Sequence, residues 1–436
     1  MARLAVAPRP DADRMLRRLG RMRLFHLPDA KFKTTALRVC LHVPLERETV
    51  TATALVPHVL ARGCRGYPDL TAVGRRLEAL YGTALGVGAT KVGESHSLYF
   101  GLDVVAARYV PDGDVLPAAL DLLGRLCLEP VLDAGGSFRA DVVRQEQEQL
   151  AGRIRSIRGD KARYAAMRCV EAMCPDEPYG LPAHGRLEDL ARLTPEDVTD
   201  RWRGVLRDAA VDVFAVGGGR DLEARLALVL DPLVAGPSRS VRTHPGPPPA
   251  AVRHVVEQDD VEQGKLCMGY RTTVRRGDAL YGAMTVCNGI LGGFPHSKLF
   301  RNVRERAGLA YYANTHWDAL KGVVLLQCGI EPDRLDEALE IIGRQTEDMQ
   351  QGRIDDDEMA FTQRGLADQL RAAADTPQAL LDDMLGQAAS GDMRTLEDRI
   401  RDIGAVTRAD VVEAAAGLRL DTVYFLTGGA PGAGGR

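Results

Sequence analysis

The sequence lacks several features that would assign it to a specialised class of protein. No apolar run approaches the ~20 residues that cross a bilayer, and charges and prolines fill the N-terminal stretch where a secretory signal has an apolar segment. The eight cysteines show no C-x-x-C spacing, so we expect buried free thiols in a reducing compartment. A formal net charge of -4 gives no electrostatic basis for binding nucleic acid or a membrane surface. These absences predict a globular cytoplasmic protein.

The chain is long, and its two halves are similar. Its 436 residues exceed one ordinary hydrophobic core, and 45% hydrophobic with 27% charged residues is typical of globular proteins. Residues 265–293 align without a gap over residues 35–63, and both stretches predict a strand, a charged turn and an apolar helix that ends at glycine. Gly82 aligns with Gly308, and LTPEDV…VFAVGG near the end of the first half matches VTRADV…YFLTGG. These matches indicate a duplication.

A segment rich in proline and glycine separates the halves. Residues 233–253 lack periodicity and are predicted to be a linker between domains 1–232 and 254–436. Strands interleaved with long helices predict an α+β fold, in which an antiparallel-rich sheet covered by helices forms each half. In the first half we expect a strand over residues 35–43 and an apolar helix over residues 50–62.

Residues 288–312, NGILGGFPHSKLFRNVRERAGLAYY, carry the strongest local pattern in the chain. They open with a turn broken by Gly289, Gly292 and Gly293, which we expect to form a flexible loop. This loop lacks the lysine and serine spacing of a phosphate-binding loop. Ser297 is then predicted to start a helix.

Arg304 and Tyr311 lie seven residues apart across the corner from that helix into a predicted strand. A guanidinium that keeps its charge, next to a phenol that donates a hydrogen bond, suits binding of a peptide carbonyl or of the oxyanion formed from it. The same spacing fits an arginine on a solvated helix face and a tyrosine half-buried in a sheet. Spacing alone favours this second interpretation.

Taken together, these features resemble the pitrilysin/insulinase family of zinc peptidases. The strongest local match is SKLFRNVRERAGLAYY, which is similar to the signature of the family's C-terminal half. Residues 31–82 look like the smaller bacterial branch, which works as paired, unlike subunits. The resemblance implies two similar halves that form a clam-shell chamber, and it places Arg304 and Tyr311 on the family's substrate-binding arginine and tyrosine.

The catalytic motif of that family is degenerate here. Catalytic members carry H-x-x-E-H on a helix of the first half, where two histidines on one face bind zinc and the glutamate activates water. In this chain Ala54 stands at the first histidine, Pro57 at the glutamate, and only His58 remains. No other H-x-x-E-H or H-E-x-x-H motif occurs in the sequence.

The remaining candidate ligands are too few for a catalytic metal. Glu146 or Glu148 corresponds to the family's downstream acidic ligand, although a solvated helix face is the favoured interpretation of both. One histidine and one carboxylate fall short of the three protein ligands of a catalytic zinc site. We therefore expect no metal and no cofactor in this chain.

The resemblance thus implies the non-catalytic subunit of a heterodimeric zinc metallopeptidase. A homologous partner subunit would carry H-x-x-E-H and the zinc, while Arg304 and Tyr311 of this chain would bind the peptide substrate. The alternative is a peptide-binding or scaffold protein, a homodimer without proteolytic activity, that assists the maturation of another protein. Independent zinc peptidase activity is disfavoured by the ligand count.

Overall fold

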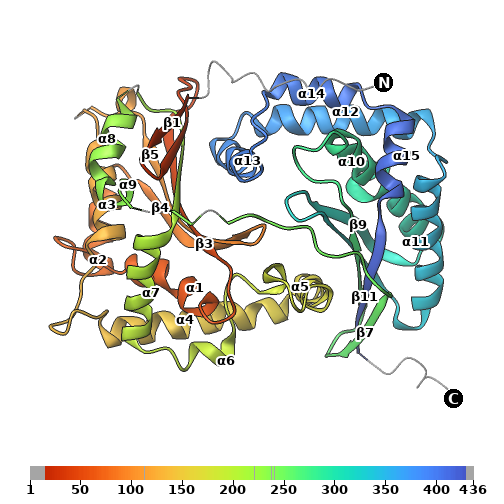
Figure 1. Ribbon diagram of the computed structural model, residues 1–436, viewed down its shortest axis with the longest axis horizontal. Coiled ribbons are helices and arrows are strands. Elements are labelled where there is room, and N and C mark those ends of the chain that lie inside the picture. The colour runs from red at the N-terminus through yellow and green to blue at the C-terminus, as the bar shows by residue number, and fades with distance from the viewer. Residues whose placement is uncertain (1–14, 112, 220, 237, 240, 429–436) are drawn as a thin grey trace. The chain divides into compact units, whose positions relative to one another are not determined.

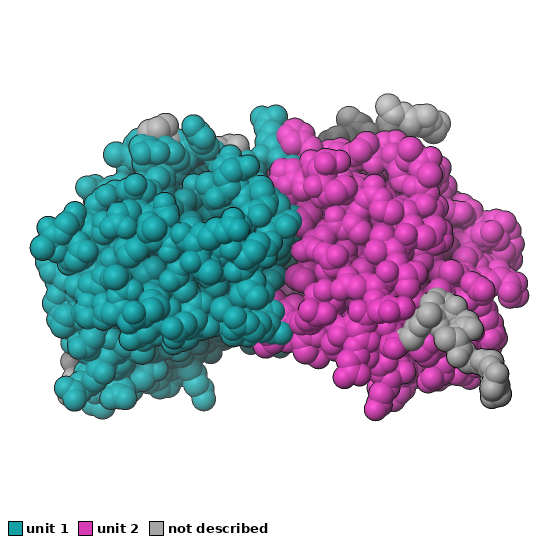
Figure 2. Space-filling view, turned by 90° about the horizontal axis from the view of Figure 1, so that it is seen from below, with its two compact units in different colours: residues 1–155, 181–242, 374–389 teal, residues 156–180, 243–373, 390–436 magenta. Residues whose placement is uncertain are grey.

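The computed structural model describes residues 15–111, 113–219, 221–236, 238–239 and 241–428 (Figure 1). The chain divides into two compact units, which are coloured teal and magenta in Figure 2. Unit 1 comprises Met1–Arg155, Leu181–Arg242 and Ala374–Ala389, and unit 2 comprises Ser156–Gly180, Thr243–Ala373 and Ser390–Arg436. Each unit is built on one mixed sheet covered by helices.

Unit 1 contains a sheet with the strand order β1-β2-β6-β3-β5-β4. Among the paired strands of this sheet in the described ranges, β2 and β6 run parallel and the other pairs antiparallel. The strands are β1 Met15–Leu19, β2 Met22–Leu27, β3 Thr34–Pro44, β4 Ala84–Val92, β5 Ser95–Val105 and β6 Ala210–Val216. The helices of this part of the chain are α1 Val50–Leu60, α2 Leu70–Ala79, η1 Ala107–Tyr109, α3 Leu116–Leu128, α4 Ala140–Gly159, α6 Leu187–Leu190, α7 Pro195–Asp208, α8 Leu222–Val229 and α9 Asp231–Val234. Apolar side chains of α1, α3 and α7 form the core with one face of the sheet.

Unit 2 contains a sheet with the strand order β7-β11-β8-β10-β9. In the part of the chain that the structure describes, β7 and β11 of this sheet run parallel and its other strand pairs antiparallel. The strands are β7 Arg253–Gln258, β8 Gly264–Arg271, β9 Ala310–Asp318, β10 Val323–Ile330 and β11 Arg419–Thr427. The helices of the second half are α10 Tyr281–Asn288, η3 Gly289–Gly293, η4 Phe300–Arg306, η5 Pro332–Arg334, α11 Leu335–Gln350, α12 Asp356–Ala373, α13 Pro377–Ser390, α14 Leu396–Gly404 and α15 Arg408–Ala416. Of these, η3 and η4 are π-helices.

The two sheets repeat one topology, since β2-β6-β3-β5-β4 and β7-β11-β8-β10-β9 share the same order and a parallel pair at the same place. The aligned helices α7 and α15 both begin with a capping box, at Thr194 and Thr407. Gly82 and Gly308 both adopt positive φ angles, 70° and 59°. The predicted α+β class and the similarity of the two halves are confirmed, while the chamber stays a prediction.

Two helices belong to the unit built mainly from the other half of the sequence. Helix α5, Lys161–Met173, belongs to unit 2, where its apolar residues pack on β8, β10 and β11. Helix α13 belongs to unit 1, and there Asp382 pairs with Arg38 of β3 at 2.5 Å. The compact units therefore differ from the partition 1–232, 233–253 and 254–436 in these two segments, because α5 packs on the sheet of the second half and α13 is tied to β3 of the first half through Arg38.

The first parallel strand of each sheet lies outside the strands expected from the sequence. In unit 1, β1 and β2 precede the predicted strand at residues 35–43. In unit 2, β7 begins at the last residue of the predicted linker 233–253, of which residues 237 and 240 lie outside the described ranges. None of the helices in those ranges combines the length and the apolar character that a bilayer crossing requires.

Candidate functional site

Helix α1 carries the degenerate motif and is buried almost throughout. Every residue of α1 except His58 is buried, because the helix packs against the core of unit 1. Ala54 is 2% exposed and presents only a methyl group. Pro57 lies inside the helix and has no backbone N–H, yet the helix continues and the backbone N–H of Ala61 bonds the Pro57 carbonyl oxygen at 3.1 Å. Neither position supplies a metal ligand or a base.

His58 is held in its neutral form. Burial lowers the pKa of its imidazole to about 4, and the positive charge of Arg153 contributes to this shift. A neutral imidazole can ligate a metal, but one such ligand does not make a site. In the described part of the chain, no group of three or more His, Cys, Asp or Glu side chains lies close enough together to hold a metal ion.

Glu146 differs from the solvated helix residue that the sequence favoured. It projects from α4, is 4% exposed, and pairs with the guanidinium of Arg62, just beyond the end of α1. Glu148, two residues further along, is exposed as expected. A guanidinium therefore neutralises the carboxylate that resembles the family's acidic ligand. Sequence reasoning missed Arg62, although its place four residues after His58 was a signal.

Two of the three glycines in the glycine-rich segment are closely packed. Gly289 and Gly292 are buried in η3. A Cβ atom at Gly292 would lie 2.8 Å from the backbone nitrogen of Thr315 on β9, and one at Gly289 would lie 2.5 Å from Cγ2 of Thr362 on α12. The prediction of a flexible loop is wrong at these two positions, because a π-helix packs there against β9 and α12. Gly293 follows them and is exposed.

The π-helix η4 brings Arg304 next to two aromatic rings. Its wide turn is closed by the backbone N–H of Ala307, which bonds the carbonyl of Asn302 at 3.2 Å. The guanidinium carbon of Arg304 lies 4.5 Å from the ring centroid of Phe300 and 5.9 Å from that of Tyr311. Arg304 and Tyr311, at the start of β9, are therefore neighbours, as their spacing predicted.

Both members of this pair are accessible. Tyr311 is 76% exposed, so the half-buried tyrosine of the alternative interpretation is not what the structure contains. Arg304 is exposed as well, and within the described residues its guanidinium forms no ion pair. Cation–π contacts fix the plane of a guanidinium without using its N–H donors. The arrangement can present several donors to a carbonyl oxygen or an oxyanion.

Phe300 is a site residue that the sequence did not single out. It precedes Arg304 by four residues, a spacing at which helical side chains meet. Its half-buried ring makes the closer of the two contacts to the guanidinium. The spacing of four residues from Arg304, which was already a candidate site residue, was the signal for this role.

The sequence of the chain is similar to curated proteins over most of its length. YmfF of Bacillus subtilis (strain 168), described as a probable inactive metalloprotease, is 34% identical over 402 residues, which are 91% of this chain and 94% of that protein. The family profile described as the peptidase M16 inactive domain matches residues 192–366. AlbE of Bacillus subtilis, described as an antilisterial bacteriocin subtilosin biosynthesis protein, is 24% identical over 284 residues, 64% of this chain and 69% of that protein.

Solved structures share the fold. A conserved protein from Enterococcus faecalis V583 has a TM-score of 0.89 and 30% identity, over 96% of this chain and 99% of that one. A peptidase M16 inactive domain from Pseudomonas fluorescens has a TM-score of 0.78 over 95% of this chain and 98% of that one. Because its identity is 18%, the second likeness concerns the fold alone.

Proposed function

Because the chain belongs to the M16 peptidase family (the pitrilysin/insulinase family) and is similar to a relative described as a probable inactive metalloprotease, we propose that it is the non-catalytic subunit of a heterodimeric zinc metallopeptidase. It binds and positions a peptide substrate for a homologous partner that carries H-x-x-E-H and the zinc. The observation that supports this proposal is the exposed guanidinium of Arg304, held beside the phenol of Tyr311 with its donors unpaired by any carboxylate in the described residues.

In the proposed complex the two subunits divide the chemistry. The H-x-x-E-H motif of the partner would hold a zinc ion, which would supply an activated water for hydrolysis. Arg304 and Tyr311 donate hydrogen bonds to the substrate backbone or to the scissile carbonyl, whose oxygen gains negative charge in the transition state. A donor of this oxyanion type lowers the barrier by about 2–4 kcal/mol. Unfolded peptides in the cytoplasm are the proposed substrates.

The degenerate site of unit 1 is consistent with this division. Ala54 and Pro57 offer neither ligand nor base, and the carboxylate of Glu146 is engaged by Arg62. Without a base near a metal-bound water, the chain alone has no route to hydrolysis by the family mechanism. The activity therefore depends on the partner subunit.

The test is co-expression of this chain with an H-x-x-E-H relative from the same genome, followed by turnover measurements on a fluorogenic unfolded peptide. Arg304→Ala and Tyr311→Phe should each leave the complex assembled and lower kcat by about tenfold or more. Arg306→Ala is the matched control, because Arg306 lies on the same helix but bonds Asn302 at 2.9 Å. Wild-type turnover in both site variants would end the assignment.

A second candidate function is supported by the similarity to AlbE, a protein described by its role in bacteriocin biosynthesis. On this candidate the chain is a homodimeric peptide-binding scaffold that assists the maturation of another protein, and no hydrolysis takes place. Arg304 and Tyr311 would then contribute affinity alone. Co-purification separates the two candidates, since a peptidase paralogue elutes with the chain only on the first.

A further inference from the structure

Strand β7 lies at one edge of the sheet of unit 2, alongside β11 (Figure 1). Its counterpart in unit 1 is β2, because each of these strands runs parallel to the last strand of its own sheet along the chain, β11 or β6. The outer side of β2 is paired with the antiparallel strand β1. Within the described residues of unit 2, no strand takes the place of β1. An edge that is covered in one half is therefore open in the other, and an open edge is a template for a further strand.

The backbone of β7 directs hydrogen-bonding groups outward at three positions. The N–H of Asp259, just after the strand, donates to the carbonyl of Thr427 on β11 at 3.1 Å. Since alternate residues of a strand direct their backbone groups to opposite sides, those of His254, Val256 and Gln258 face away from β11. In the described ranges no backbone group from another segment pairs with them. The edge thus offers N–H donors and carbonyl acceptors to a strand beside it.

The side chains of β7 leave the middle of this edge apolar and hold the strand in place. Val256, at the middle, is 53% exposed. Val255 points to the other face, where it packs against the apolar cluster that α5 forms with the sheet. Glu257 accepts a hydrogen bond from the phenol of Tyr424 on β11 at 2.7 Å. A strand that is already ordered in this way loses little entropy when another strand pairs with it.

The charges of β7 favour an antiparallel neighbour of the same sequence. Arg253 begins the strand, whereas Glu257 lies near its end and Asp259 follows it. In a parallel pair of two β7 strands like charges would lie opposite each other, which is destabilising. In an antiparallel pair the basic start of each strand lies against the acidic end of the other. A second copy of this chain has this arrangement when a two-fold axis relates the copies, because such an interface joins one surface to itself.

We propose that two copies of the chain associate by antiparallel pairing of their β7 strands across a two-fold axis at Val256. In this register Val256 lies opposite Val256 of the other copy, and His254 lies opposite Gln258. Arg253 lies opposite Asp259, so that opposite charges meet. The outward backbone groups of both strands are then paired, by about six hydrogen bonds. The exposed valine is buried at the centre, and the two sheets become one.

The first experiment is sedimentation velocity of the full chain from about 1 to about 300 μM, because mass action makes the dimer fraction depend on concentration. We expect a dimer whose fraction rises over this range. Val256→Lys places two like charges at the axis and should raise the Kd of the dimer by about tenfold or more. Leu228→Lys is the matched control, because Leu228 on α8 of unit 1 is 80% exposed, and it should keep the wild-type Kd.

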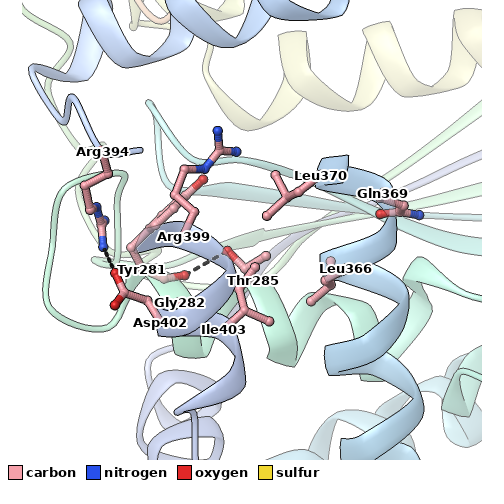
Figure 3. A pocket seen from close by; sticks show the side chains of 10 residues that line it. All are labelled: Tyr281, Gly282, Thr285, Leu366, Gln369, Leu370, Arg394, Arg399, Asp402 and Ile403. Carbon is pink, nitrogen blue, oxygen red and sulfur yellow. Dashed lines mark hydrogen bonds and ion pairs between the residues drawn. The ribbon is translucent and has the colours of Figure 1, made fainter. Parts of the chain in front are cut away.

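Leu370→Ala controls for the stability of unit 2. Leu370 lines a cavity of about 150 Å³ between α10, α12 and α14, to which β7 contributes no lining residue (Figure 3). The truncation removes apolar contacts and should lower the unfolding temperature, yet it should keep the Kd of the dimer. Val256→Lys should unfold at the wild-type temperature, since the side chain that it replaces is exposed.

A disulfide tests the register. In Val256→Cys the two new thiols lie opposite each other, where facing Cα atoms are about 5.5 Å apart, a separation that a disulfide spans. Val252 is also exposed, but it lies four residues from the axis in each strand, which separates the two Cα atoms by about 26 Å. With diamide as the oxidant, Val256→Cys should form a covalent dimer and Val252→Cys should not. The wild-type cysteines are buried and give the background.

A wild-type chain that stays monomeric over this concentration range would overturn the proposal, as would an unchanged Kd in Val256→Lys or an equal loss of dimer in Leu370→Ala. Covalent dimers from Val252→Cys, with none from Val256→Cys, would overturn it as well. The interface contains neither Arg304 nor Tyr311 and rests on neither candidate function. Its failure therefore leaves the turnover test of those two residues untouched, and the two failures are distinguishable.

Discussion

Gly292→Ala tests whether the glycine-rich segment is a packed π-helix or a loop free to move. The added Cβ atom would lie 2.8 Å from the backbone nitrogen, Oγ1 and Cγ2 of Thr315. Thr315 cannot retreat easily, because β9 is paired with β10 at this residue. Overpacking of a filled interior costs about 1–3 kcal/mol. We expect Gly292→Ala to lower the free energy of unfolding of unit 2 by that amount.

Gly343→Ala is the matched control on helix α11, where a Cβ atom would meet nothing within 4 Å. Because alanine restricts the unfolded chain and favours the helix, this variant should gain about 0.5–1 kcal/mol. Urea unfolding followed by tryptophan fluorescence in a Trp202→Phe background, where Trp317 is the remaining tryptophan, compares both variants with the same parent. A Gly292→Ala variant within about 0.5 kcal/mol of wild type would refute the packing argument.

Three further changes have defined outcomes. Arg62→Met leaves the buried carboxylate of Glu146 without its cation and should lower the free energy of unfolding by about 3–5 kcal/mol. Adding Glu146→Leu should restore most of this loss, because the uncompensated charge is then removed. A loss below about 1 kcal/mol would contradict the buried ion pair. The folded state holds the His58 pKa at about 4, below the ordinary histidine value of 6.5, so the unfolded state takes up the proton first as pH falls. The contribution of neutral His58 to the free energy of unfolding is therefore fully present above pH 6.5 and is lost between pH 6.5 and about 4. In that range His58→Gln should reduce the slope of the unfolding free energy against pH by up to about one proton. An unchanged slope would argue against a buried imidazole. Phe300→Leu removes a cation–π contact of about 0.5–1 kcal/mol and should weaken peptide binding about two- to fivefold. Phe300→Trp should restore the wild-type affinity, because it returns an aromatic ring to this position. Equal affinity of the leucine variant and wild type would show that the ring does not orient Arg304.

Local sequence patterns predicted much of the fold because they encode local structure. The capping boxes at Thr194 and Thr407 and the positive φ angles of Gly82 and Gly308 are properties of a few consecutive residues, and the matching sequences at these places revealed the duplication. Local patterns did not predict that α5 belongs to unit 2 and α13 to unit 1. An apolar helix face indicates burial, but its periodicity does not say which sheet it covers.

Some features of the candidate site could likewise be predicted from local sequence, and others could not. The proximity of Arg304 and Tyr311 followed from their spacing across a helix-to-strand corner. The burial of Glu146 did not, since the run QEQEQ has the composition of a surface and its partner Arg62 lies on another helix end, 84 residues away. The packing of Gly292 against Thr315 was equally hidden, because glycine content alone does not separate a close approach from a flexible turn.

The most direct test of the central claim is the affinity of the full chain for a fluorescein-labelled unfolded peptide, measured by anisotropy without any partner subunit. If Arg304 and Tyr311 contact peptide, Arg304→Ala should weaken binding by about tenfold, which is about 1.4 kcal/mol, while Arg306→Ala keeps the wild-type Kd. Equal Kd values for wild type and Arg304→Ala would contradict the account.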